Sequence, residues 1–361
     1  MGYDLAVCSG VRPTRTNGLL DVVASYTTYK LLTALDRDMK LKKVLAGAAG
    51  AVGVATVTNR ILASKATDLG PALPTGEQAN YRWRGFDISY TEAGDPESPD
   101  LVLFHGINAA ASSHEFRPSI EALAEHYHVL VPDLPGFGHS DRPPLLYSAS
   151  LYETFVTDFL EDNTEDATVV ASGLTGSYAA TAAHDVDIER LVLLCPTDYT
   201  MGDEPRVWLR SLLRAPLVGQ TIFNGIVSKR SMRYFHEDHG YHDMDNLSDD
   251  TLEYEWQSAH QSGARFAPAS FVSGFLDPEA SLADTLADLD VPVTIIWGRD
   301  ADVTPLSYGR ELADAADARL IVFDDSQLLP HVEHPEQYVD VVRGEYEDAE
   351  TVEDEEVADE A

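Results

Sequence analysis

Short apolar runs recur along this chain, and stretches with helical spacing lie between them. The runs lack the apolar–polar alternation of a half-exposed strand, which indicates strands buried on both faces of a parallel sheet. We expect such strands at 101–104, 128–131, 168–171, 191–195, 291–297 and 320–323. Helices are expected at 115–126, 150–160, 175–184 and 307–316. This alternation predicts an α/β protein with a doubly wound, mostly parallel sheet.

Two departures from this rhythm suggest the domain organisation. Residues 81–90 alternate as a hairpin does and open the α/β core, which we expect to span 80–198 and 286–344. Residues 199–285 separate two expected strands and contain helical and aromatic segments, so we expect an inserted helical cap. The other expected parts are a weakly ordered N-terminal extension (1–38), an Ala/Gly-rich apolar helix (39–65), a linker (66–79) and an acidic disordered tail (345–361).

The apolar helix leaves the location of the protein open. Its uncharged part, 44–58, is shorter than the roughly 20 apolar residues that cross a bilayer. Three interpretations remain: a soluble or loosely packed helix, an anchor giving weak membrane association through residues 44–63, and a cleaved signal peptide. Met39 is also an alternative start, which would make 1–38 an artefact. We expect a cytoplasmic protein, with association through this helix as the membrane-bound alternative.

Acidic residues dominate the charge. The chain has 61 acidic and 25 basic residues and a formal net charge of -36. The carboxylates are spread along the whole chain, which favours adaptation to a salt-rich cytosol, and they oppose binding to nucleic acid and to anionic lipid. A basic stripe of Arg206, Arg210 and Arg214 in the expected cap is predicted to pair with acidic groups, or else to bind an anionic ligand.

No cofactor or metal is expected. The two cysteines, Cys8 and Cys195, give neither a disulfide framework nor cysteine-based zinc spacing. Histidines at 236, 239 and 242 follow at three-residue intervals, but Gly240 and the neighbouring aromatic residues favour a polar turn over a rigid metal-binding helix.

Three segments resemble the α/β-hydrolase superfamily, in the branch with epoxide hydrolases, haloperoxidase-like esterases and haloalkane dehalogenases. They read LFHGIN at 103–108, VPDLPGFGHSDRP at 131–143 and LPHVEHPE at 329–336. The resemblance covers 80–345 and implies the α/β-hydrolase fold with an inserted helical cap. It implies an oxyanion hole or pocket at His105, Gly106, Ile107, Asn108 and Leu174, with backbone N–H groups near Ile107 and Leu174 as donors.

The catalytic positions that the resemblance implies hold residues without the necessary chemistry. Aligned without gaps, the nucleophile position of the turn after strand five is Gly173, the acid position is Ala301 and the histidine position is Leu328. Glycine has no atom to attack with, and leucine cannot accept a proton, so no covalent intermediate can form there.

Two functions therefore stay open. The first is a non-catalytic homologue, with a degenerate triad, that binds a small apolar or carbonyl-bearing molecule, or a protein, in a pocket under the cap. The second is an active hydrolase of an ester, epoxide or similar small substrate with displaced residues. Its candidates are Ser172 or Thr175 as nucleophile, His331 as base, His331 or His105 acting on a bound water, and Asp300, Asp302 or Asp198 as orienting acid.

Overall fold

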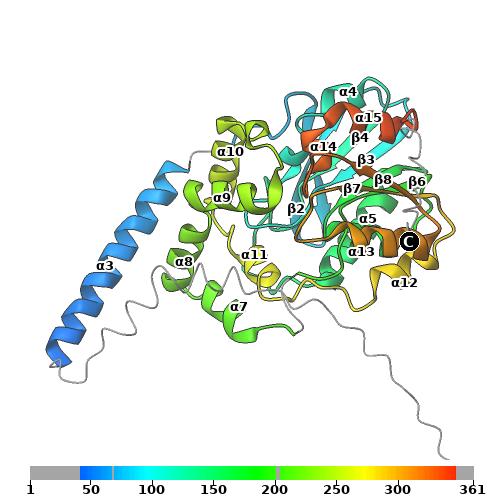
Figure 1. Ribbon diagram of the computed structural model, residues 1–361. Coiled ribbons are helices and arrows are strands. Elements are labelled where there is room, and N and C mark those ends of the chain that lie inside the picture. Colours follow the sequence, from blue (N-terminus) through cyan, green and yellow to red (C-terminus); the bar gives the residue numbers. More distant parts are fainter. Residues whose placement is uncertain (1–40, 67–68, 201–203, 347–361) are drawn as a thin grey trace, which may run out of the picture. The chain divides into compact units, whose positions relative to one another are not determined.

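A computed structural model describes residues 41–66, 69–200 and 204–346 (Figure 1). The expected extension at 1–38 lies outside the described residues, as does nearly all of the expected tail. Contacts divide the chain into units of 1–54 and 55–361, and the second unit holds the whole sheet. Helix α3 (Leu41–Lys65) begins in the first unit. None of the described helices combines the length and the apolar character needed to cross a membrane.

One eight-stranded sheet forms the core, in the order β1-β2-β4-β3-β5-β6-β7-β8. The pairs β1–β2 and β2–β4 are antiparallel, and all other neighbours are parallel. The expected mostly parallel, doubly wound sheet is therefore confirmed. Its strands are β1 (Glu77–Trp83), β2 (Phe86–Ala93), β3 (Asp100–Phe104), β4 (His128–Pro132), β5 (Thr168–Ser172), β6 (Arg190–Leu194), β7 (Val293–Gly298) and β8 (Arg319–Phe323).

Helices cover both faces of the sheet. The apolar cluster on one face includes side chains of α5 (Ala149–Asn163), α6 (Thr175–Ala182), α12 (Leu282–Ala287) and α13 (Leu306–Ala316). The cluster on the other face includes side chains of η2 (Ser113–Phe116), α4 (Ile120–Ala124) and α15 (Pro335–Arg343). The central strands are buried on both sides, which explains their continuous apolar sequence.

The expected helix at 115–126 is wrong as one element. The segment instead forms the 3₁₀ turn η2 and the short helix α4. Pro118 lies between them and has no backbone N–H to continue a helical hydrogen-bond pattern.

The cap is inserted between β6 and β7. It contains α7 (Val207–Arg214), α8 (Val218–Ile226), α9 (Lys229–Phe235), η3 (His236–Gly240), η4 (Met244–Asn246), α10 (Asp249–Ala259) and α11 (Phe266–Phe271). The carboxylate of Glu333, in α14 (Pro330–Glu333), ties the cap to the core. It accepts hydrogen bonds from the N–H groups of His242 (2.8 Å) and Asp243 (3.1 Å), and on the core side from Gln327 N–H (2.9 Å) and the Ser326 hydroxyl (3.1 Å).

The turn after β4 is organised by the buried carboxylate of Asp133. It accepts hydrogen bonds from the N–H groups of Ser113 and His139, both at 2.7 Å. Burial alone would raise the pKa of Asp133, but its bonds to His139 and Ser113, together with the nearby His105, lower it to about 2. Gly138, at φ +49°, leaves room for this carboxylate, because a Cβ there would lie 2.0 Å from Asp133 Cγ.

This contact predicts the effect of two alanine substitutions. Both Gly85 (φ +98°) and Gly138 have positive φ, but a Cβ on Gly85 meets no atom within 4 Å. We expect Gly85→Ala to lower the free energy of unfolding by about 1–2 kcal/mol, from backbone strain alone. Gly138→Ala should lower it by about 3 kcal/mol or more, since Asp133 must also leave its donors. Urea denaturation measures both, and equal losses would show that the Asp133 contact is unimportant.

Candidate active site

The turn after β5 is sharp and has glycine at its tip. Gly173 has φ +55°, and its N–H donates to Leu194 O at 2.9 Å, while its carbonyl accepts from Thr197 N–H at 3.2 Å. A Cβ on Gly173 would meet no other atom within 4 Å. The tip of the turn therefore faces open space where a side chain could stand.

Two backbone N–H groups follow the neighbouring strands β3 and β5. Ile107 follows β3, and Leu174 directly follows Gly173 at the start of α6. Among the residues that the structure describes, neither the Ile107 N–H nor the Leu174 N–H has a hydrogen-bond acceptor. Such paired donors are the usual parts of a site for a ligand oxygen. Asn108 is exposed, and its side-chain oxygen accepts from Ala110 N–H at 2.7 Å.

The other two positions of the expected triad hold apolar side chains. Ala301 follows β7 and is 5% exposed. Leu328 follows β8 and packs, partly buried, against the main apolar cluster. Neither side chain ionises or forms hydrogen bonds, so neither can orient or accept a proton.

Beside this turn, a glutamate that the sequence analysis did not single out joins three segments. One carboxylate oxygen of Glu115 accepts from Gly106 N–H at 2.9 Å, and the other lies 3.1 Å from His331 Nε2. The hydroxyl of Ser172 lies beside this carboxylate, since both lie next to Gly106. Glu115, in η2, thus connects the loop after β3, the end of β5 and helix α14.

The electrostatics of this cluster favour a charged carboxylate. Burial acts to raise the pKa of Glu115, but His331, Ser172 and His105 outweigh it, and the pKa is lowered. The Glu115 side chain is 11% exposed and that of His331 is 1% exposed. Within the described residues, neither ring nitrogen of His331 accepts a hydrogen bond from a hydroxyl, which a base that activates a nucleophile requires.

Ser172 and His331 are thus brought into one cluster, but the link between them is a carboxylate. Ser172 is 4% exposed, and its hydroxyl lies beside Glu115. A nucleophilic serine needs an imidazole that accepts its proton. A carboxylate with a lowered pKa is a weak proton acceptor, so it activates a serine little. The geometry therefore lends little support to the displaced pair as nucleophile and base.

Two further candidates are occupied by the backbone. The hydroxyl of Thr175 donates to the carbonyl of His105 at 2.8 Å and is fully buried. His105 Nε2 accepts from Leu134 N–H at 3.0 Å, which leaves the proton on Nδ1, 2.7 Å from Gly106 O. Both side chains therefore support the loop after β3 and do not point a reactive atom into open space.

The candidate acids are placed elsewhere. Asp300 and Asp302 are exposed, and Asp300 lies 3.0 Å from Nδ1 of His242 in the cap. Asp198 accepts from Leu282 N–H at 2.9 Å and from the Tyr308 hydroxyl at 2.8 Å. Asp300 and Asp198 therefore have partners other than His331.

The three histidines at 236, 239 and 242 do not converge. His236 pairs with Glu255 at 2.7 Å and His239 with Asp238 at 3.0 Å. His242 lies between Asp300 and Asp325, the latter at 3.8 Å, and these three exposed side chains have the spacing of a metal-binding group. The ion pairs of His242 account for that arrangement without a metal.

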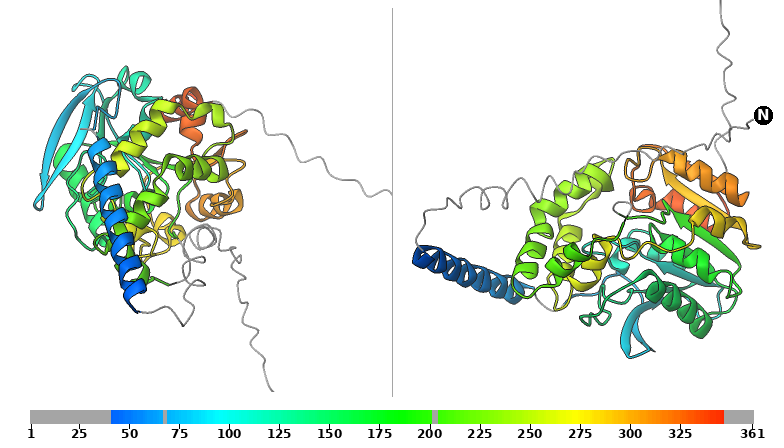
Figure 2. Two further views of the ribbon diagram at one scale, coloured as in Figure 1. Left: turned by 90° about the vertical axis from the view of Figure 1, so that its left-hand side faces the viewer. Right: turned by 90° about the horizontal axis from the view of Figure 1, so that it is seen from below.

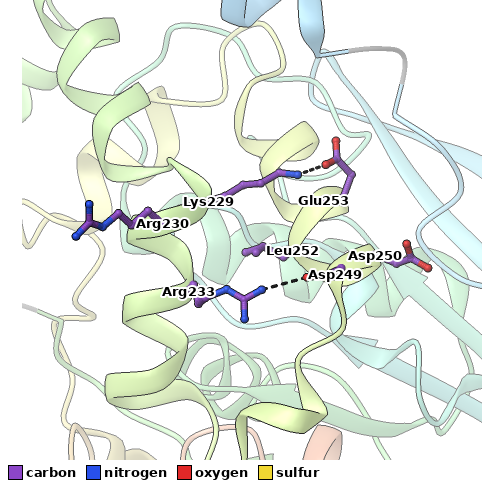
Figure 3. Close-up of a pocket in the computed structure, with 7 residues that line it drawn as sticks. All are labelled: Lys229, Arg230, Arg233, Asp249, Asp250, Leu252 and Glu253. Carbon is purple, nitrogen blue, oxygen red and sulfur yellow. Dashed lines mark hydrogen bonds and ion pairs between the residues drawn. The ribbon is translucent and has the colours of Figure 1, made fainter.

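One hollow, of about 700 Å³, lies on the cap between α9 and α10 and is crossed by the ion pairs Lys229–Glu253 and Arg233–Asp249 (Figure 3). Its mixed charges pair with each other, and Gly173 is not among the residues that line it. Another hollow lies between the loop after β3 and the cap and has no room for a water molecule. Its lining includes Ala110, Phe137, Arg142 and Ala259. The cap is therefore closed tightly over this loop.

Comparisons with known proteins agree with this architecture. A family model described as the alpha/beta hydrolase family matches residues 101–341. An uncharacterized protein of Mycobacterium bovis is 26% identical over 278 residues, covering 72% of this chain and 77% of its own. A pimeloyl-[acyl-carrier protein] methyl ester esterase of Vibrio vulnificus is 25% identical over 251 residues, covering 67% and 92%. The solved 2-hydroxy-6-oxo-6-phenylhexa-2,4-dienoate hydrolase of Rhodococcus superposes with a TM-score of 0.60 at 21% identity, covering 75% and 99%.

The cluster of Glu115, Gly106, Ser172 and His331 predicts a loss of stability that depends on pH. Glu115→Gln keeps the shape and removes the charge facing His331, which should lower the free energy of unfolding by about 3 kcal/mol at pH 7. Since the folded-state pKa of Glu115 is lowered, its contribution is complete above the ordinary glutamate pKa and is lost as pH falls through the folded value. Wild type and variant should therefore converge in acid. Glu121→Gln, on the exposed side of α4, is the control, and a similar loss there would contradict the assignment.

Proposed function

Because the chain belongs to the alpha/beta hydrolase family, we propose that it is a non-catalytic member that binds a small molecule through a carbonyl or carboxylate oxygen. The observation that carries this proposal is the pair of N–H groups of Ile107 and Leu174, which have no acceptor within the described residues. They belong to the loops that follow the paired strands β3 and β5, and the second of these loops contains Gly173. A ligand oxygen would accept both hydrogen bonds.

The same site opposes turnover by a covalent route. The tip of the turn carries no nucleophile, and the polar groups beside it are buried: Ser172 lies next to Glu115, which pairs with His331. Donors that remain without a nucleophile and base stabilise a bound oxygen but leave residual catalysis of only about 10³–10⁴ over water. Retained binding without efficient reaction is the expected result.

The relatives suggest the chemistry of the ligand. The Vibrio relative is named as a methyl ester esterase and the Rhodococcus structure as a dienoate hydrolase, so both names refer to esters or carboxylates. In this chain, the cap lies tightly on the loop after β3. We therefore propose a short-chain carboxylate or ester, with access through movement of the cap.

Binding is tested by removing one donor. Leu174 has φ -63°, which proline adopts, so Leu174→Pro removes the N–H with little backbone change. Leu174→Ala keeps the N–H and loses the same buried side chain, which makes it the matched control. With butyrate and hexanoate as probes in calorimetric titration, the proline variant should bind about 10–100-fold more weakly than the alanine variant. Equal affinities would remove this N–H from the site.

Turnover is tested by restoring the triad. We expect wild type and Ser172→Ala to hydrolyse p-nitrophenyl butyrate at the same low rate. The triple variant Gly173→Ser, Ala301→Asp, Leu328→His should exceed it by about tenfold or more, while each single variant should not, because triad residues act as a unit. Rapid wild-type turnover that disappears in Ser172→Ala would favour the alternative, an active hydrolase with displaced residues.

A further inference from the structure

Two segments of this acidic chain contain no acidic residue. Residues 39–67 carry five basic residues and residues 205–236 carry six, so together they hold eleven of the 25 basic residues and none of the 61 acidic ones. At the average acidic content of the chain, segments of this combined length would carry about ten carboxylates. The overall charge of -36 therefore conceals a local reversal of sign.

The two segments meet in the fold. The side-chain amide of Asn59, in α3, donates to Thr221 Oγ1 at 3.1 Å and to Leu217 O at 3.5 Å. Its oxygen accepts from Asn224 Nδ2 at 3.0 Å. Helix α8 in turn contacts both α7 and α9. We define the acid-free face as residues 55–66 of α3 together with α7, α8 and α9, which Figure 2 shows from two sides.

Large apolar side chains are exposed on and beside this face. Trp208 is 60% exposed, and the loop residue Leu146, also 60% exposed, lies nearby because Arg214 of α7 donates to Pro144 O and Leu145 O. Of twelve exposed large apolar residues among those described, nine lie here: Val57, Ile61, Leu145, Leu146, Val207, Trp208, Leu212, Val218 and Tyr234. A gathering of this kind marks an interaction surface, whereas scattered single residues do not.

Basic side chains accompany the apolar ones. Arg60, Arg206 and Arg230 have no carboxylate partner within the described part of the chain. Arg210 lies over the ring of Phe275, 3.3 Å from its centre, and Arg214 is held by backbone carbonyls, so both also remain without a carboxylate. Lys229 and Arg233, at the margin, pair with Glu253 and Asp249 of α10.

We propose that the acid-free face docks on an anionic lipid surface. A molecule with a charge of -36 is repelled by such a surface, whereas this face combines the absence of carboxylates with unpaired arginines and exposed apolar side chains. Tryptophan prefers the boundary between headgroups and acyl chains, and amphipathic helices bind there without crossing.

A second copy of this chain fits the face less well. The remaining surface of the described chain is acidic and could attract the arginines. It offers few exposed apolar residues to cover Trp208 and its neighbours, since Tyr199, Val52 and Val54 complete the set of twelve. A lipid surface supplies both the negative charge and the apolar layer.

The test uses the full chain and large unilamellar vesicles of phosphatidylglycerol or phosphatidylcholine. We expect the protein to sediment with phosphatidylglycerol vesicles, to bind phosphatidylcholine at least about tenfold more weakly, and to lose binding as salt rises. Brominated acyl chains should quench its fluorescence, and Trp208→Phe should remove that quenching. Trp83 and Trp297 are buried and should not respond, and Trp256, half-buried on α10, is replaced by phenylalanine in both proteins compared.

The variants separate this face from other causes of binding. Arg60→Ser/Arg206→Ser/Arg230→Ser should weaken vesicle binding by about tenfold or more, whereas Arg310→Ser, an exposed arginine on α13, should leave it unchanged. Circular dichroism confirms folding of each variant. Undiminished binding of the triple variant would overturn the proposal, as would equal binding to both lipids. Concentration-dependent self-association that Trp208→Ser abolishes would also overturn it, in favour of a second copy.

Discussion

A carboxylate shielded from water must be matched by donors or positive charge, and Glu115 meets this requirement only because three separate segments converge on it. Gly106 supplies a backbone N–H, His331 an imidazole at 3.1 Å, and the Ser172 hydroxyl lies beside them. In the wider family these segments carry the oxyanion hole, the nucleophile and the base. Here their polar groups are directed at one another, so the cluster stabilises the frame around a turn that has no reactive side chain.

The fold could be predicted well because burial on both faces leaves a strong local signal. The continuous apolar runs at 101–104 and 168–171 became β3 and β5, and the hairpin at 81–90 became the pair β1–β2. The prediction was wrong at 115–126, where helical spacing concealed the effect of Pro118. A single residue without an N–H outweighs a good periodic pattern, because a helix requires every successive donor.

The candidate site could be predicted only in part. The positions of Gly173, Ala301 and Leu328 followed from anchoring motifs on either side, which fix the register along the chain. The role of Glu115 could not be predicted, because its partners are 9, 57 and 216 residues away, at Gly106, Ser172 and His331. A signal was present: a glutamate directly before the buried Phe116, in a segment expected to pack on the sheet. Spacing alone does not show which side chains meet.

The net charge of the chain, like sequence spacing, does not describe what surrounds a particular residue. A net charge of -36 describes how the molecule as a whole behaves in a distant field, but contacts are decided over a Debye length of about 8–10 Å. Within that distance, Glu115 and Asp133 are surrounded by hydrogen-bond donors and histidines. A membrane surface that approaches α7 meets arginines and Trp208. The acidic part of the protein surface is repelled by a negatively charged membrane, so few orientations of the protein near that membrane are favourable. The favoured orientation turns α7, α8 and α9 toward the membrane, and these helices belong to the cap that closes over the loop after β3. If a ligand reaches Gly173 through movement of the cap, as we propose, contact at the acid-free face and access to the turn after β5 involve the same helical insertion.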